Sequence, residues 1–279
     1  MRFLYHAHEV HDVQEVHEVQ EVGGNLMKKI VIANQKGGVG KTTTANALAG
    51  VLMHEGKRVL MIDADPQCNT SDTYQAAIAD TATLYDLLFS KEPVHDVIQH
   101  TEVGDIIAGD PLLSQADMQL TKTGKEFTLK KAMVPIQEEY DFIIIDTAPS
   151  LGILLINALT YADSVIVPIT ADRYSLQGLS QLNETIQAVM EYTNPDLRIA
   201  GLLRTRYRAR TILSREVSAA LPEIAEMLNT QVFQTVIREC TAAQQAQTRR
   251  VPLLQHAPKC TTALDYFQLV REIFCDRGE

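Results

Sequence analysis

The sequence lacks any apolar run of the roughly 18–20 residues that a bilayer-spanning helix requires. It also lacks the basic start and apolar stretch of a secretory signal. None of its cysteines has the CxxC or CxxH spacing typical of zinc sites: Cys68, Cys240, Cys260 and Cys275. These absences favour a cytosolic protein with reduced thiols, and they predict no stable membrane association.

An overall positive charge is also missing, because the net charge is −10 over 279 residues. The average hides an asymmetry: residues 197–262 hold ten basic and four acidic residues, a local net charge of +6. A basic face on an acidic protein can still attract a polyanion.

Residues 8–22 form five triplets that each end in valine. A period of three matches neither the strand period of about 2 nor the helix period of about 3.6, so no apolar face forms. We predict that residues 1–26 are a disordered, low-complexity leader. A second hypothesis is that translation starts at Met27, because the Gly23–Gly24 codons can contain a ribosome-binding sequence. The intact mass of the natural protein distinguishes the two.

From residue 27 onward, strand-like and helix-like segments alternate. The strand-like segments are short and mostly apolar throughout, as strands buried on both faces are: Lys29–Asn34, Arg58–Asp63, Gly104–Ala108, Phe142–Asp146, Ser164–Ile169, Arg198–Leu203 and Val232–Ile237. The others have helical periodicity: Thr42–His54, Leu112–Leu120, Glu126–Glu139, Gly152–Tyr161, Leu176–Tyr192, Thr211–Met227 and Thr262–Phe274. We therefore predict an α/β fold, a single-domain three-layer sandwich over residues 27–279 with a mostly parallel central sheet.

A glycine-rich loop stands between the first strand and the first helix, the context of a phosphate-binding loop. It reads Lys36, Gly37, Gly38, Val39, Gly40, Lys41, Thr42, Thr43. Glycines let several backbone N–H groups point at one phosphate, and the helix N-terminus adds partial positive charge. We predict that residues 36–43 bind ATP, with Lys41 neutralising the β- and γ-phosphates and the Thr42 hydroxyl on Mg²⁺.

Carboxylates follow two of the predicted strands. The first segment runs from Asp63 through Asp65 to Asn69, and the second begins at Asp146. The carboxyl ends of parallel strands lie beside the phosphate-binding loop, so Asp146 is predicted to hold Mg²⁺ through a water. Asp65 is placed to orient the attacking water. Either carboxylate alone would more often be a cap or turn residue.

The loop departs from the general P-loop pattern, because Gln35 replaces its first glycine and a second lysine, Lys36, precedes the glycines. This spelling resembles the deviant Walker A motif of the ParA/MinD family. The two carboxylate segments resemble its switch I and Walker B–switch II segments, and the resemblance covers nearly all of residues 28–275. It implies a P-loop ATPase in which Lys36 reaches the nucleotide of a dimer partner, with Lys41 and Asp65 also catalytic. The alternative is that Lys36 is a solvated turn lysine.

The resemblance is to the small, Soj-like ParA group, whose members bind nonspecific DNA as ATP-bound homodimers. A ParB-type partner stimulates their weak hydrolysis and releases the DNA. It therefore implies a cytoplasmic, nucleoid-associated ATPase that partitions a plasmid, a chromosome or a mobile element.

Arginines support the DNA-binding expectation, because alternate residues of a strand project on one side and can neutralise several phosphates. The candidates are Arg204, Arg206, Arg208 and Arg210, with Arg249 and Arg250 in addition. A solvated loop, or internal ion pairs with the abundant acids, is the alternative. Family members often carry P-R-N-V-R after the late strand, whereas this chain has Ala242 at the position of the last arginine.

Two other functions remain open at this point. A MinD-like, membrane-associated or protein-cargo-positioning ATPase would keep the same nucleotide site, but it needs a basic amphipathic terminal helix. The tail from Leu264 is apolar on one face and not lysine-rich. An iron protein of the nitrogenase type would need paired cluster cysteines, and Cys68 and Cys240 do not match their positions.

Overall fold

The computed structural model describes residues 28–172 and 177–274. The predictions for residues 1–26, for the start site at Met27 and for Cys275 lie outside these ranges. Within them, no helix has the length and apolar character needed to cross a membrane.

The centre of the molecule is an eight-stranded sheet in the order β3-β4-β2-β5-β1-β6-β7-β8. Every neighbouring pair is parallel except β3 with β4. The strands are β1 (Lys29–Ile32), β2 (Val59–Ala64), β3 (Ile98–His100), β4 (Asp105–Ile107), β5 (Phe142–Thr147), β6 (Ser164–Thr170), β7 (Arg198–Tyr207) and β8 (Val232–Arg238). All seven predicted strands are present, and the predicted α/β fold with its mostly parallel sheet is confirmed.

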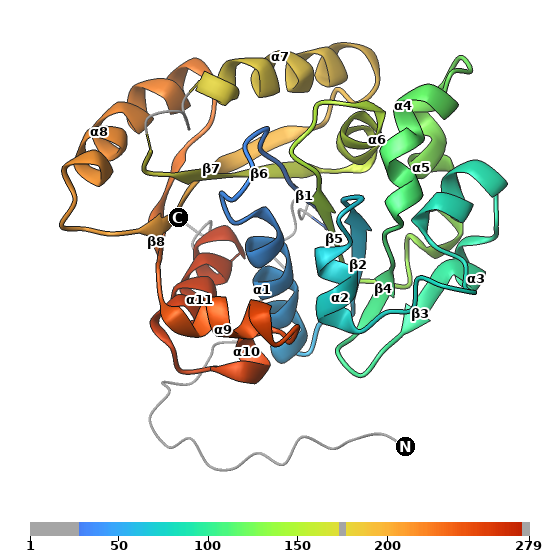
Figure 1. Ribbon diagram of the computed structural model, residues 1–279. Coiled ribbons are helices and arrows are strands. Elements are labelled where there is room, and N and C mark those ends of the chain that lie inside the picture. The colour runs from blue at the N-terminus through green and yellow to red at the C-terminus, as the bar shows by residue number, and fades with distance from the viewer. Residues whose placement is uncertain (1–27, 173–176, 275–279) are drawn as a thin grey trace.

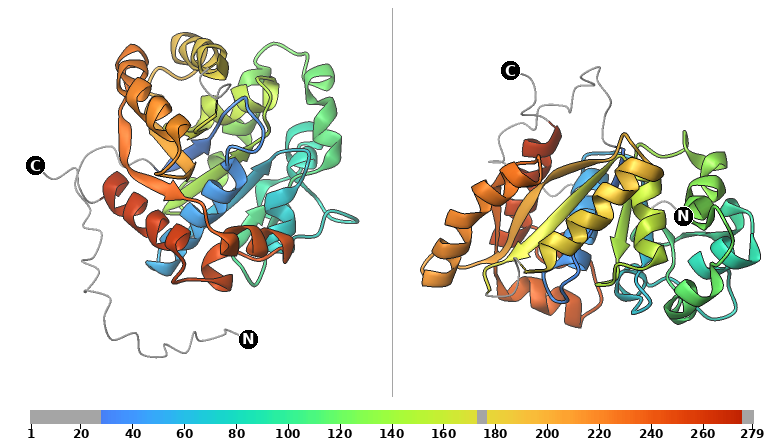
Figure 2. Two further views of the ribbon diagram at one scale, coloured as in Figure 1. Left: turned by 60° about the vertical axis from the view of Figure 1, so that its left-hand side comes forward. Right: turned by 90° about the horizontal axis from the view of Figure 1, so that it is seen from above.

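Helices cover both faces of this sheet (Figure 1), because its central strands are apolar on both sides. One face carries α1 (Lys41–His54), α9 (Thr241–Thr248), α10 (Leu253–His256) and α11 (Thr261–Phe274). The other carries α5 (Thr128–Ala132), α6 (Ile153–Tyr161), α7 (Gln177–Tyr192) and α8 (Ile212–Met227). In the left view of Figure 2, α7 and α8 lie across the sheet from α11. Successive residues of β1 alternate between the two cores: Val31 belongs to one, and Ile30 and Ile32 to the other.

The helices predicted between β4 and β5 are broken into short pieces. Residues 112–120 form a 3-10 turn, Pro111–Gln115, followed by α4 (Ala116–Gln119). Residues 126–139 form Lys125–Phe127 (3-10), α5 and Val134–Ile136 (3-10). Pro135 has no N–H to donate and disfavours the α-conformation at the residue before it, which favours a break in the helix at this point. Short elements not predicted are α2 (Asn69–Tyr74), the π-turn Asp86–Ser90, α3 (Val94–Val97), β3, α9 and α10.

Candidate active site

The loop between β1 and α1 is shaped by glycines. Gly38 has a φ of 75° and Gly40 a φ of 87°, values that side chains with a Cβ rarely adopt. A Cβ added at Gly37 or Gly38 would meet no atom within 4 Å, so open space lies beside the backbone there. The loop leads directly into the N-terminus of α1 at Lys41. This is the cradle that backbone N–H groups and a helix dipole offer to phosphate.

Hydrogen bonds from β6 and β7 hold this loop in place. The Asn34 side chain accepts the Lys36 N–H (2.9 Å) and donates to the Pro168 carbonyl (2.7 Å). From β7, the Thr205 hydroxyl donates to the Val39 carbonyl at 2.7 Å. Sequence reasoning missed Thr205, because a single threonine in a strand has no recognisable spacing to the loop that it supports.

Lys41 is buried at the base of the loop, and its Nζ donates to the Lys36 carbonyl at 3.0 Å. Burial lowers the pKa of Lys41, and the nearby carboxylates of Asp146 and Asp65 oppose that shift. The ammonium therefore lies close to Asp65, the predicted catalytic carboxylate, and to Asp146, the predicted Mg²⁺ ligand. Phosphate oxygens would supply the negative charge that a buried ammonium needs.

Asp146 is the next-to-last residue of β5 and is completely buried. Burial raises the pKa of its carboxyl to about 7, nearby Asp63 adds to the rise, and hydrogen bonds from Thr42 and Thr70 oppose it. The Thr70 hydroxyl donates to Oδ2 at 2.8 Å, whereas Oδ1 has no hydrogen-bond partner among the described residues. A buried carboxylate oxygen left unsatisfied beside Thr42 fits a hydrated Mg²⁺, which prefers oxygen ligands and keeps several waters.

A second buried carboxylate, Asp63, ties α2 to the sheet. Its Oδ2 accepts the N–H of Ser71 at 2.8 Å and the Ser71 hydroxyl at 2.7 Å, and Ser71 Oγ in turn accepts the Gly109 N–H at 2.8 Å. Burial raises the pKa of Asp63 to about 6, against the hydrogen bonds from Ser71. Thr70 and Ser71 thus join the start of α2 to two strand-end carboxylates. We did not select either residue from the sequence, although both directly follow the Asp63–Asn69 segment.

Asp65, the predicted water-orienting residue, is 7% exposed and lines the same cavity as Gly38 and Lys41. Its Oδ1 accepts the Gln67 N–H at 2.9 Å, so Asp65 makes the turn contact that was the alternative to a catalytic role. Asp65 nevertheless lines the cavity. A role in hydrolysis stays a prediction.

The cavity has a volume of about 770 Å³, which is in the range of nucleotide and cofactor sites. Of the predicted phosphate-binding residues, it brings together Gly37, Gly38, Gly40, Lys41, Thr42 and Thr43. Val39 is fully buried beneath the loop and does not line the cavity. Lys36 also lies outside the lining and forms an ion pair with Asp172, which follows β6.

The arginines separate into different environments. Arg204 donates to the Phe233 and Gln234 carbonyls of β8 at 2.9 and 3.1 Å, so it is bound to the sheet. The strand register shifts between Arg204 and Tyr207, and Arg206 has a φ of 49°, so the expected regular alternation is interrupted there. Arg210 and Arg249 are exposed, and Arg250 forms an ion pair with Asp72 at 3.7 Å.

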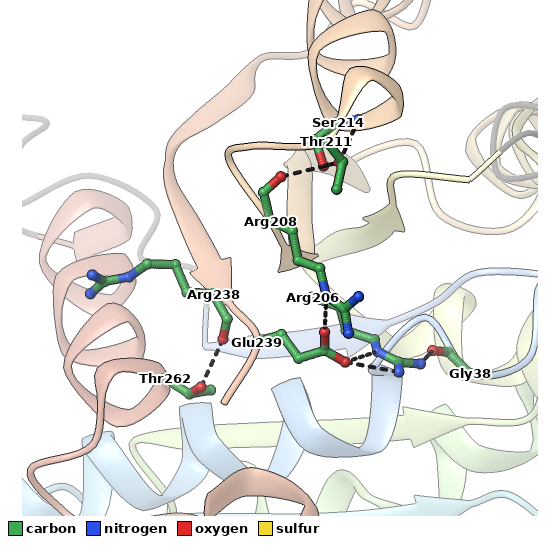
Figure 3. Close-up of polar contacts among 8 residues, drawn as sticks. All are labelled: Gly38, Arg206, Arg208, Thr211, Ser214, Arg238, Glu239 and Thr262. Atoms are coloured by element: carbon green, nitrogen blue, oxygen red, sulfur yellow. Dashed lines mark hydrogen bonds and ion pairs between the residues drawn. The ribbon is translucent and has the colours of Figure 1, made fainter. Parts of the chain in front are cut away.

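Glu239 connects the arginines to the cavity (Figure 3). Its carboxylate forms ion pairs with Arg206 (3.0 Å) and Arg208. Arg206 also reaches the Gly38 carbonyl of the loop at 3.4 Å, and both Arg206 and Glu239 line the cavity. The alternative that the arginines form internal ion pairs therefore holds for two of the four candidates between residues 204 and 210, namely Arg206 and Arg208.

Known proteins share this architecture. Residues 27–199 match a family model described as an AAA domain. Over 250 residues the chain is 40% identical to the sporulation initiation inhibitor protein Soj of Bacillus subtilis, covering 88% of this chain and 98% of that protein. It is 36% identical to the chromosome-partitioning ATPase Soj of Treponema pallidum, and the match covers 90% of this chain and 99% of that protein.

A solved structure extends the comparison to a nucleotide complex. Cobyrinic acid a,c-diamide synthase from Mycobacterium smegmatis, with bound ADP and magnesium, has a TM-score of 0.75 and 29% identity, covering 88% of this chain and 93% of that one. Together with the glycine loop, the strand-end carboxylates and the parallel sheet, these similarities show that the chain belongs to the ParA/Soj family of P-loop partitioning ATPases.

Proposed function

We propose that this protein binds ATP with Mg²⁺, forms a face-to-face homodimer and hydrolyses ATP to ADP and phosphate. In the ATP state the dimer binds nonspecific DNA, and a ParB-type partner stimulates hydrolysis to release it. The cargo is a plasmid, a chromosome or a mobile element, and the protein is cytoplasmic and nucleoid-associated.

The observation that carries this proposal is the arrangement of Lys41, Thr42 and Asp146 around the loop. The loop amides and Lys41 would bind the phosphates, and Thr42 and Asp146 would hold Mg²⁺, which would supply positive charge against the negative charge that develops during transfer. Asp65 would orient the attacking water. Residues 237–240 line the same cavity, and we propose that the base binds near them.

Lys36 supports a dimer because it is not among the residues that line the cavity of its own chain. Its Nζ pairs with Asp172 instead. We propose that it leaves this carboxylate for the phosphates of the partner subunit when two ATP-bound chains meet. A phosphate carries more negative charge than a carboxylate, so the exchange is favourable only when nucleotide is present.

The state of α11 argues against a membrane readout. Its apolar residues, including Tyr266, Leu269 and Ile273, are buried against α1 and the sheet. An amphipathic helix that inserts into a membrane must instead have its apolar face available.

The test compares wild type with Lys36→Ala and Lys41→Ala. We expect ATP and Mg²⁺ to convert the wild type from monomer to dimer in light scattering. Lys36→Ala should bind nucleotide yet remain monomeric, because only the contact across the interface is lost. Lys41→Ala should lose nucleotide affinity itself. ATP-driven dimers and normal turnover of Lys36→Ala would contradict the proposal.

A further inference from the structure

Two consecutive hydroxyl groups at the start of α2 meet two carboxylates that lie side by side in the sheet. Asp63 of β2 and Asp146 of β5 occupy paired positions of neighbouring parallel strands. The Ser71 hydroxyl donates to Asp63 at 2.7 Å. The Thr70 hydroxyl donates to Asp146 at 2.8 Å, and all four residues are fully buried. The two contacts are alike in length and burial, but only the second involves the predicted Mg²⁺ ligand.

A third side chain completes the surroundings of Thr70. Asn46 lies one turn after Thr42 on α1, the helix beside α2 (Figure 1), and both Asn46 and Thr42 line the nucleotide cavity. The Asn46 amide donates to Thr70 Oγ1 at 3.4 Å. An ionised carboxylate can only accept, so the single proton of the Thr70 hydroxyl is committed to Asp146. The three groups therefore form a chain of hydrogen bonds with one direction, from Asn46 through Thr70 to Asp146.

This chain of hydrogen bonds determines which oxygen of Asp146 is available. Thr70 occupies Oδ2, whereas Oδ1 is buried and has no hydrogen-bond partner within residues 28–172 and 177–274. Thr70 itself does not line the cavity. Outer groups of this kind orient a ligating carboxylate and raise metal affinity without touching the metal.

We propose that Thr70 is a positioning residue for the Mg²⁺ ligand: its hydroxyl, supported by Asn46, holds Asp146 so that Oδ1 stays available to a hydrated Mg²⁺. The inference deepens the proposed function and rests on it, because the ion binds together with the nucleotide. It assigns to α2 a part in metal binding that its sequence, without a ligating side chain aimed at the ion, does not reveal.

Thr70→Val keeps the shape of the side chain and removes the hydroxyl. Oδ2 of Asp146 then loses its donor in a buried position, and the carboxylate is no longer held in one orientation. Loss of such an outer contact typically lowers metal affinity about 10–100-fold. Thr70→Ser keeps the hydroxyl and should therefore keep the affinity.

The test measures by calorimetry the affinity of Mg²⁺ for the full chain in complex with ADP, and separately the affinity of ADP without divalent ions. We expect Thr70→Val to weaken Mg²⁺ binding by about tenfold or more and to leave the affinity for ADP alone unchanged. Thr70→Ser should bind Mg²⁺ nearly as the wild type does. Asn46→Ala removes the donor to Thr70 and should weaken Mg²⁺ binding in the same direction, but less, because its hydrogen bond is longer.

Ser71→Ala is the matched control, because Ser71 is the next residue of α2, equally buried and bonded in the same way to a strand-end carboxylate. It should lower the stability of the protein and leave Mg²⁺ affinity unchanged. Equal losses of Mg²⁺ affinity in Ser71→Ala and Thr70→Val would show that only the anchoring of α2 matters, and would overturn the proposal. Wild-type Mg²⁺ affinity in Thr70→Val would also overturn it.

Two further outcomes separate this inference from other failures. If Thr70→Val does not fold, Asn46→Ala decides: reduced Mg²⁺ affinity supports the proposal, and wild-type affinity overturns it. A wild-type protein that binds no ADP would instead refute the proposed function. A wild-type protein that binds ADP without Mg²⁺ would overturn the assignment of Asp146 as the metal ligand, and the role of Thr70 with it.

Discussion

Cys240 and Cys68 show how surroundings give one kind of side chain opposite properties. Cys68 lies in a buried turn near the carboxylates of Asp63 and Asp110. Its burial, followed by these charges, raises the pKa of its thiol to about 12. Partial burial raises the pKa of the Cys240 thiol, but polar groups at the starts of α9 and α11 outweigh it and bring the pKa to about 7. The carboxylate of adjacent Glu239 is already neutralised by two arginines, so it opposes the Cys240 thiolate less than a free carboxylate would.

We therefore predict that alkylation of Cys240 by iodoacetamide titrates near neutral pH. A lowered pKa places the thiolate at lower pH, so the rate should rise through about pH 7 and then level off. Cys68 should stay unmodified across the same range. The measurement is the rate of alkylation at each cysteine between pH 5.5 and 8.5, a span of about three units around the expected midpoint. A Cys240 midpoint near the usual value of a free thiol would contradict the prediction.

Single residues differ in how far the sequence reveals them. The residues of the phosphate-binding loop could be predicted because the backbone that they form is local: the glycines, Lys41 and Thr42 are consecutive. Thr205 and Ser71 could not, because their partners, Val39 and Gly109, are brought to them only by the tertiary fold. The ion pair between Glu239 and Arg206 could not be predicted from their separation in the sequence, because it depends on how β7 and β8 are paired.

At the scale of elements, α11 has a structural task that its amphipathic pattern does not reveal. β8 is the last strand of the sheet, so its outer N–H groups have no neighbouring strand. Carboxylates of α11 accept several of them. Glu272 accepts the N–H groups of Gln234 (2.6 Å) and Thr235 (2.9 Å), and Asp265 accepts that of Arg238 (2.8 Å).

Glu272→Ala is predicted to lower the free energy of unfolding by about 1–2 kcal/mol, because two backbone donors lose a charged acceptor. Equilibrium urea denaturation measures the change. Glu216→Ala on the exposed face of α8 is the matched control and should change stability by less than about 0.5 kcal/mol. Equal effects of the two substitutions would show that the carboxylate of Glu272 does not stabilise the edge strand.

Element prediction succeeded where the pattern was long and regular and failed where the chain turns often. All seven predicted strands are present, but β7 extends to Tyr207 beyond the predicted Leu203, since the polar Arg204–Tyr207 end pairs with β8. Between β4 and β5, apolar residues at helical spacing suggested two helices. Proline and the packing of short turns against α6 divide them. The spacing of apolar residues predicts which face of a helix is buried, but it does not show whether the hydrogen bonds of the helix backbone continue from one turn to the next.

At the scale of the whole molecule, the proposed binding of DNA has to be explained for a chain whose net charge is negative. The net charge of −10 repels DNA at long range, so binding depends on a local basic surface. Arg206 lies at the end of β7 beside the cavity and Arg208 directly follows that strand, whereas Arg198 is exposed at the opposite end of β7. In the absence of DNA, Arg206 and Arg208 share Glu239, and phosphates would have to replace that carboxylate.

We predict that Arg206→Ala combined with Arg208→Ala weakens DNA binding at saturating ATP, a condition that is needed because Arg206 also lines the nucleotide cavity. Each arginine that contacts a phosphate contributes about 0.9 to the slope of log affinity against log salt, so the slope should fall by about 2 in the double variant. Arg198→Ala, the control, removes one positive charge from the far end of β7 and should leave the slope unchanged.

DNA retention measured across a salt series distinguishes the two positions, because a general effect of net charge would change the slope in both variants. An unchanged slope in the double variant would move the DNA-binding surface to other residues, and exposed Arg210 and Arg249 would be the next to substitute.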